Sequence, residues 1–116
     1  MQLSVVLVRT KYSNNIGATA RAMANMGAHQ LILIEPQCEK NLEAYKSAAC
    51  GQSILDHSQI FTNWQNYLEL YPKSIKVGFT ARSCKKRTSY FWKDLLQQNL
   101  NFENTHLVFG PEDHGL

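Results

Sequence analysis

Four short apolar runs, separated by stretches of helical character, constrain the fold more than any other feature of the sequence. The runs are Leu3–Val8, Leu31–Ile34, Ile75–Phe79 and Leu107–Phe109. They carry Val, Ile, Leu and Phe with little polar alternation, which is typical of strands that are buried on both faces of a sheet. The alternation of strand and helix predicts an α/β domain with a mainly parallel sheet flanked by helices.

The stretches between the runs predict helices. They cover Gly17–Met26, Asn41–Cys50, Thr62–Tyr71 and Ser89–Leu100. Asn14 and Asn15 resemble a helix entry, Thr62 is a suitable capping residue, and Gly27 stands where a C-terminal cap belongs. A weak additional strand is expected at Gln59–Phe61.

The composition limits the class of protein. A chain of 116 residues is long enough for one core, so we expect a single domain over residues 1–116. The hydrophobic fraction of 44% and the charged fraction of 18% are ordinary for a folded globular protein. No apolar run approaches the roughly 20 residues that cross a bilayer, and Met1–Ser4 does not open a secretory signal. A cytoplasmic protein without a membrane partner is therefore expected.

Cysteine content and charge narrow the choice of partners. The three cysteines, Cys38, Cys50 and Cys84, are widely spaced and form no C-x-x-C pair. This spacing argues against a zinc ribbon or a disulfide framework and favours reduced thiols packed as small apolar groups. We expect no metal. The formal net charge of +3 is compatible with an anionic partner but does not require one.

Three loops are the places where chemistry is expected. In open parallel sheets, ligands bind beyond the carboxyl ends of the strands. The loops that follow the first, third and fourth apolar runs are Arg9–Ile16, Thr80–Thr88 and Gly110–Leu116.

Arg21 stands out in the helix that follows the first loop. Ile16, Ala20, Met23 and Gly27 share one stripe at helical spacing, and that stripe should pack on the sheet. Arg21 lies about 140° from Ile16, so it projects toward the loop side or the solvent. Its position suits either an ordinary solvated arginine or an arginine aimed at a phosphate or a substrate hydroxyl.

The string from Asn15 to Gly27 carries a family resemblance. Asn15-Ile-Gly-Ala-Thr-Ala-Arg21, followed by Ala22-Met23 and Met26-Gly27, resembles motif 1 of the SpoU/TrmH branch of SPOUT methyltransferases. It is most similar to the TrmJ-type tRNA methyltransferases, which carry N-x-G-x-x-x-R-A-M-x-x-M-G. The resemblance implies that Arg21 is the catalytic arginine and that Asn15 is its partner asparagine.

The second loop fits the same family. On residue types alone, small residues at the end of a buried strand indicate a turn or a close approach of a ligand to the backbone. The family has a G-[T/x]-[S/T]-A-R segment here, whose backbone helps to hold S-adenosylmethionine. Phe79, Thr80 and Ala81 match it, with Phe79 bulkier than the usual small residue.

A basic cluster follows, with aromatic residues after it. Arg82, Lys85, Lys86 and Arg87 fall within six residues and precede Tyr90-Phe91-Trp92. The pattern suits a nucleic-acid surface as well as a solvated charge run beside a packed helix. The family resemblance favours RNA contact by these four residues and by Arg9.

The end of the chain resembles motif 2 of the family, written L-V-F-G-x-E-x-x-G-L. The match covers Phe109, Gly110, Glu112, Gly115 and Leu116, and the family uses this loop to contact the donor. An acid–base or metal site at the adjacent Glu112 and Asp113 is a weaker reading, because no third ligand accompanies the pair.

The family's third motif has no counterpart in these residues. That motif supplies a serine- and asparagine-containing loop and a final helix threaded through a preceding loop, which makes the trefoil knot of the SPOUT fold. We therefore expect an α/β-knot domain that is incomplete at its C-terminus, with one wall of the donor pocket missing and apolar sheet surface exposed. Little donor affinity and no methyl transfer are expected of residues 1–116 alone.

The resemblance implies an S-adenosylmethionine-dependent RNA 2′-O-ribose methyltransferase. The implied target is the ribose at position 32 of the tRNA anticodon loop, with ribosomal RNA as the nearest alternative, and the implied assembly is a homodimer. The 2′-hydroxyl is a poor nucleophile, so it needs deprotonation and alignment with the donor. Arg21 would draw in an RNA phosphate and act with it to remove the proton, while Asn15 fixes the loop or the ribose. Because an arginine side chain stays protonated in proteins, we expect it to clamp phosphate first and to act as a base second.

A second class of function is a non-catalytic RNA-binding module built on the same fold. Such a module would keep the basic cluster without using the donor. A generic nucleotide-binding α/β domain lacks support, since the sequence has no G-x-G-x-x-G or Walker loop.

Overall fold

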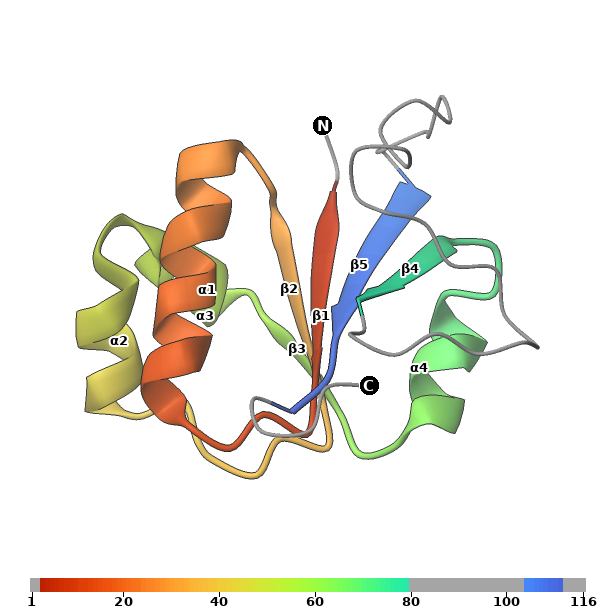
Figure 1. Cartoon of the computed structure of the whole chain (residues 1–116), viewed down its shortest axis with the longest axis horizontal. Coiled ribbons are helices and arrows are strands. Elements are labelled where there is room, and N and C mark those ends of the chain that lie inside the picture. The colour runs from red at the N-terminus through yellow and green to blue at the C-terminus, as the bar shows by residue number, and fades with distance from the viewer. Residues whose placement is uncertain (1–2, 80–103, 112–116) are drawn as a thin grey trace.

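A five-stranded parallel sheet forms the centre of the protein (Figure 1). The computed structural model describes residues 3–79 and 104–111. The strands are β1 (Ser4–Val8), β2 (Gln30–Ile34), β3 (Gln59–Phe61), β4 (Ile75–Phe79) and β5 (Thr105–Phe109). They lie in the order β3-β2-β1-β5-β4, and every neighbouring pair is parallel. The predicted parallel sheet is confirmed, including the weak strand at Gln59–Phe61.

Helices cover both faces of this sheet. They are α1 (Ser13–Met26), α2 (Leu42–Ala48), the 3-10 turn η1 (Ala49–Gly51), α3 (Gln52–Asp56) and α4 (Trp64–Leu70). Figure 1 shows α1, α2 and α3 on one face of the sheet and α4 on the other. The predicted helix Ser89–Leu100 lies outside the described residues. No helix in the described ranges is long and apolar enough to cross a membrane.

Two predicted helix starts are wrong. Helix α1 begins at Ser13, with Tyr12 in an extended conformation at the N-cap and no side-chain cap, so Asn14 and Asn15 lie in the first turn. Helix α4 is capped by Asn63, not by Thr62, because the Asn63 side chain accepts a hydrogen bond from the N–H of Asn66 at 2.8 Å. Both errors are small shifts of an end whose helix was predicted correctly.

The predicted helix Asn41–Cys50 is broken in the structure. Asn41 caps α2, and its side chain accepts a hydrogen bond from Ala44 N–H at 3.1 Å. The helix then ends at Ala49, whose φ of 48° lies in the left-handed region that L residues rarely adopt. The chain continues through η1 into α3, which the sequence pattern did not predict.

Two apolar clusters, one on each face of the sheet, make up the core. On the α1 face, Ile16, Ala20 and Met23 are buried against β1, β2 and β5, which confirms the predicted stripe for these three residues, whereas its fourth member, Gly27, is exposed. On the α4 face, Tyr67 is fully buried among alternate residues of the same strands. The expectation that all four apolar runs are buried on both faces is wrong for β4, an edge strand in which Ile75 is 41% exposed.

The two described cysteines differ in their surroundings. Both are free thiols. Cys38 is half-buried and donates to the carbonyl oxygen of Thr10, whereas Cys50 is exposed in η1 and is not the small core residue that was expected. Cys84 lies outside the described residues.

Two glycines allow α1 to touch its neighbours at the backbone. A Cβ at Gly17 would lie 2.1 Å from the carbonyl oxygen of Ala44 in α2. A Cβ at Gly51 in η1 would lie 2.4 Å from the carbonyl oxygen of Ala20 in α1. These separations are well inside van der Waals contact, so only glycine lets α2 and η1 approach α1 this closely. Gly27, with φ of 80°, is the C-terminal cap of α1, as predicted.

A polar network lies on the α4 face near the amino ends of the strands. The hydroxyl of Tyr67 lies 2.6 Å from Nδ1 of His106, and both side chains are buried. Burial raises the pKa of Tyr67 to about 12, so the phenol stays protonated and can donate to Nδ1 of a neutral imidazole that carries its proton on Nε2. Beside this pair, Tyr71 accepts a hydrogen bond from Gln30 and donates one to Gln59, which joins α4 to β2 and β3.

Replacement of Gly17 by alanine tests the close approach of α1 and α2. The new Cβ has no room beside the Ala44 carbonyl, so one helix must move, and we expect a loss of about 3 kcal/mol in the free energy of unfolding. Gly27→Ala is the matched comparison, because nothing lies within 4 Å of its Cβ and only the positive φ opposes it, at about 1 kcal/mol. Urea unfolding followed by circular dichroism measures both. Equal losses for the two variants would contradict the close contact.

His106 makes the stability of the fold depend on pH. Burial lowers its pKa, and the positive charge of Lys76 adds to the effect. The unfolded chain therefore binds this proton at higher pH than the folded chain does. The stability contributed by the neutral imidazole is complete above about pH 6.5 and is lost as the pH falls below that value, by at most about 1.4 kcal/mol per pH unit.

His106→Asn removes the titrating group and keeps an oxygen that accepts from Tyr67. We expect a shallower fall in the urea midpoint between pH 7 and pH 5 than in the parent protein. Tyr67→Phe, which removes only the donor, should lower stability by about 1–3 kcal/mol at neutral pH. An unchanged pH profile in His106→Asn would refute the assignment.

Candidate functional site

The carboxyl ends of β1, β5 and β4 lie side by side. Leu7 of β1 pairs with Phe109 of β5, and Phe109 pairs with Phe79 of β4. The loops that follow these three strands were all predicted to hold ligands, and β1 and β5 meet near the centre of the strand order, where such sheets have their binding crevices. The structure thus brings the predicted loop positions to one edge.

A shallow hollow of about 520 Å³ lies along the outer surface of α1, where α2 forms a second wall. We call it the amide groove. Its lining residues come from α1, with one from α2, and are Asn14, Asn15, Ala18, Arg21, Ala22, Asn25 and Ser47. The two predicted catalytic residues, Arg21 and Asn15, therefore line the same hollow.

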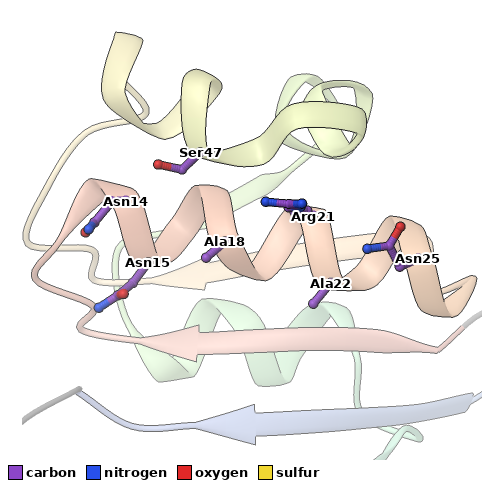
Figure 2. A pocket seen from close by; sticks show the side chains of 7 residues that line it. All are labelled: Asn14, Asn15, Ala18, Arg21, Ala22, Asn25 and Ser47. Atoms are coloured by element: carbon purple, nitrogen blue, oxygen red, sulfur yellow. The ribbon is translucent and has the colours of Figure 1, made fainter.

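The side chains of these two residues point in different directions. Figure 2 shows Asn15 directed toward the carboxyl end of β1, and Arg21 on the side of α1 that faces η1 and α3. Arg21 is exposed, and no hydrogen bond or ion pair joins its guanidinium to another described residue. Six residues of helix separate the two positions, which places Arg21 about 9 Å farther along α1. The expectation that Arg21 avoids the core is confirmed, but it does not face the strand ends.

A second hollow, of about 510 Å³, lies between α1 and the sheet. We call it the apolar hollow. Its walls include Leu7, Met23, Met26 and Phe109, and Gly110 lies at its carboxyl-edge end. Asn15, Ala18 and Ala22 line both hollows, so the amide groove and the apolar hollow meet along one side of α1.

Phe79 packs against an aromatic residue of the neighbouring strand, Phe109. Its ring stacks on that of Phe109, with centroids 4.6 Å apart and planes inclined by only 3°. The pair closes the carboxyl ends of β4 and β5 with an apolar surface. The family usually has a small residue at position 79, and here the larger Phe79 ring packs on Phe109 of the neighbouring strand.

Arg9 lies directly after β1 at the same edge. It is exposed and has a φ of 55°, while its N–H donates to the carbonyl oxygen of Ile34 at 2.8 Å. Glu35 repeats the arrangement after β2, with φ of 48° and a hydrogen bond to Phe61. After β1 and after β2, the backbone thus makes one more hydrogen bond to the neighbouring strand. The chain then turns away from the sheet, and the side chains of Arg9 and Glu35 lie in solvent.

Most of the other predicted site residues lie outside the described part of the chain. They are Thr80, Ala81, Arg82, Lys85, Lys86, Arg87, Glu112, Gly115 and Leu116. Of the residues expected to hold the donor, the structure describes Phe79 and Gly110. Within residues 3–79 and 104–111, no group of three or more His, Cys, Asp or Glu side chains is arranged to hold a metal ion.

Sequence reasoning missed three polar residues of the amide groove: Asn14, Asn25 and Ser47. Helical spacing could have revealed two of them, because positions 14, 18, 21 and 25 fall within about 60° of one another on a helical wheel. Ser47 could not have been found in this way. It enters the groove because α2 approaches α1 at Gly17, where a Cβ would lie 2.7 Å from the Ser47 Cβ.

Comparison with known proteins identifies the family of this chain. The sequence profile of the SpoU rRNA Methylase family matches residues 2–116. A tRNA (cytidine-2′-O-)-methyltransferase, TrmJ of Methanocaldococcus jannaschii, is 31% identical over 119 residues, which cover 100% of this chain and 52% of that protein.

Two solved structures share the fold. The crystal structure of TrmJ from Z. mobilis superimposes with a TM-score of 0.76 at 24% identity, covering 100% of this chain and 52% of that one. The SpoU methyltransferase AviRb of Streptomyces viridochromogenes, in complex with the cofactor AdoMet, superimposes with a TM-score of 0.75 at 19% identity, covering 99% and 45%. The chain thus spans about half the length of these proteins. From its sequence and its fold, the chain belongs to the SpoU rRNA Methylase family.

Proposed function

We propose that this protein is an S-adenosylmethionine-dependent 2′-O-ribose methyltransferase that acts on tRNA. The observation that supports the proposal is that Asn15 and Arg21, which match the family's first motif, both line the amide groove, with Asn15 directed toward the carboxyl edge of the sheet. The relative from M. jannaschii, named as a tRNA (cytidine-2′-O-)-methyltransferase, supports the substrate class. We also propose a cytoplasmic location, which is compatible with a tRNA substrate.

We assign the binding site of the methyl donor, S-adenosylmethionine, to the carboxyl edge of the sheet. S-adenosylmethionine is a substrate here and supplies a methyl group on a sulfonium. Gly110 leaves backbone accessible at the end of the apolar hollow, and the stacked Phe79–Phe109 pair offers a flat apolar surface that suits a purine ring. Thr80, Ala81, Glu112, Gly115 and Leu116 complete the proposed donor site. The methyl transfer that we propose uses no metal ion. For residues 1–116 alone we propose weak donor binding and little transfer, since they span about half of the related enzymes.

The reaction needs a proton acceptor and an in-line geometry. The 2′-oxygen attacks the methyl carbon, a C–O bond forms, the S–CH₃ bond breaks, and the hydroxyl proton leaves to a phosphate oxygen. Arg21 holds that phosphate by a charge-assisted fork, and its lack of a described protein partner leaves the guanidinium available. Asn15, directed toward the strand ends, fixes the ribose or the loop beside the donor.

We further propose that the protein works as a homodimer. Two observations support this assembly. The apolar hollow and the exposed Met26 present apolar side chains beside α1, and Arg21 faces away from its own strand ends. A second subunit would cover the surface and bring an arginine and a donor loop together. Arg9 and the basic residues Arg82, Lys85, Lys86 and Arg87 are proposed to contact the RNA.

Replacement of Arg21 tests the catalytic assignment. In the full-length protein, Arg21→Ala should lower methyl transfer to a tRNA transcript by about 100-fold or more, because the phosphate loses its charged clamp. Arg21→Lys should recover only part of the rate, since an ammonium lacks the guanidinium fork. Transfer of radiolabelled methyl groups measures both, and Lys73→Ala, an exposed positive charge elsewhere, is the control. Near-normal transfer by Arg21→Ala would overturn the assignment.

The target nucleotide is tested with a modified substrate. We expect methylation of the ribose at position 32 of the anticodon loop, and a transcript that carries 2′-deoxycytidine only at that position should not be methylated. A transcript with the same change at a neighbouring position is the control. Transfer to the deoxy-32 transcript would place the target elsewhere. Transfer to ribosomal RNA alone would favour that substrate, and tRNA binding with no transfer by the full-length protein would favour the non-catalytic RNA-binding module.

A further inference from the structure

Asn25 is one of the polar residues of the amide groove to which the family motif assigns no role. It lies one turn beyond Arg21 on the same face of α1, at a position that the motif N-x-G-x-x-x-R-A-M-x-x-M-G leaves variable. Side chains four residues apart on a helix are neighbours, with Cβ atoms about 5–6 Å apart. A ligand held by Arg21 is therefore within reach of Asn25.

The chemistry of the groove suits a phosphodiester. Its polar lining consists of asparagines, a serine and one arginine, and it contains no acidic residue. Ala18 and Ala22 form a floor without long side chains, so a backbone phosphate can approach the helix closely. A cavity with one positive charge, several neutral donors and no carboxylate favours a singly charged anion with several acceptor oxygens.

Cys50 orients the Asn25 amide. Its thiol donates to Oδ1 of Asn25 at 3.7 Å across the gap between η1 and α1. With Oδ1 engaged in this way, the NH₂ group is the part of the amide that is left for the groove. In Figure 2 the nitrogen of the Asn25 amide lies on the side nearer to Arg21, and its oxygen lies on the other side.

The contact depends on the close approach of η1 to α1. A Cβ at Gly51 would lie 2.8 Å from the backbone nitrogen of Arg21, so the residue after Cys50 is pressed against the helix turn that carries the arginine. The same contact that positions the Arg21 backbone therefore positions Cys50 beside Asn25.

We propose that Asn25 is an RNA-binding residue that donates a hydrogen bond to the phosphodiester held by Arg21, and that Cys50 is a positioning residue that acts through Asn25. The proposal rests on the proposed function, because it takes the ligand of the groove to be the tRNA backbone. It adds a neutral donor to the binding site from a position outside the family's fixed residues.

The first test separates a neutral donor from a charged one. The dissociation constant of the full-length protein for an unmodified tRNA transcript is measured by fluorescence anisotropy across a series of salt concentrations. Asn25→Ala should weaken binding about tenfold and leave the dependence of log Kd on log salt unchanged, because no counterion-releasing contact is lost. Arg21→Ala should reduce that slope by about 0.7, the value for one phosphate contact with a single strand.

Asn66→Ala serves as the matched control. Asn66 is an exposed asparagine on α4, on the opposite face of the sheet, and its side chain donates to Thr62 at 3.2 Å. This variant should bind tRNA like the parent protein, and both asparagine variants should unfold at the parent urea midpoint. Weaker binding by Asn25→Ala that is accompanied by a lower unfolding midpoint would count against a direct contact.

The second test asks whether Cys50 acts through Asn25. Cys50→Ala should weaken tRNA binding by several-fold, and Cys50→Ser should restore it, since a hydroxyl also donates to Oδ1. In the double variant Asn25→Ala/Cys50→Ala, the two effects should not add, because the alanine at position 25 leaves nothing to orient. Additive losses, or no recovery with serine, would refute the positioning role.

The outcomes also separate this proposal from the proposed function. Parent-like tRNA affinity in Asn25→Ala, together with normal methylation by the parent protein, would overturn the role of Asn25 and leave the methyltransferase standing. Absence of both tRNA binding and methyl transfer in the full-length parent protein would overturn both.

Discussion

The contact between α1 and the α2–η1 segment is the constraint on which the site depends. At Gly17 and Gly51 the backbones approach to distances that no side chain allows. This closeness gives the amide groove its second wall, because Ser47 and Cys50 are carried toward the outer face of α1. The helix that holds Asn15 and Arg21 is thereby fixed on two sides, by the sheet through Ile16 and Met23 and by α2 and η1 through glycine.

The strand order completes the site from the other side. From β1, the strands β2 and β3 follow one another toward one edge of the sheet. On the other side of β1 lies β5, and β4 forms the opposite edge of the sheet beside β5. Residues near opposite ends of the chain therefore meet, and Leu7 pairs with Phe109. Asn15, Ala18 and Ala22 lie where the amide groove and the apolar hollow join, so the two hollows are separated by one side of α1.

The sequence predicted the elements that bury apolar surface, and missed the features that depend on contacts between elements. Leu3–Val8 and Leu31–Ile34 were recognisable because burial on both faces leaves an unbroken apolar run. The stripe through Ile16, Ala20 and Met23 was recognisable from its period. The break at Ala49 was not, because alanine favours a helix and its left-handed conformation is imposed by the packing of η1 against α1.

The same distinction applies to the candidate site: some of its residues could be predicted from the sequence, and its geometry could not. Arg21 and Asn15 were identified from a motif in contiguous sequence. Ser47 enters the groove, and Arg21 faces η1, because of how the α2–η1 segment packs against α1. No local sequence pattern predicts the packing of two segments that are far apart in the chain. The stack of Phe79 on Phe109 likewise depends on the pairing of β4 with β5.

The buried network of Tyr67 and His106 has a consequence for how this protein tolerates change. It lies on the α4 face of the sheet, while the amide groove lies on the opposite face, along the outer surface of α1. Substitutions in the network are therefore expected to act mainly on folding, whereas exposed polar side chains of the groove contribute little to the core. An exposed residue of the groove such as Asn25 can therefore be replaced without disturbing the network on the other face of the sheet. The sheet itself thus separates the interactions that stabilise the fold from the residues that are free to change.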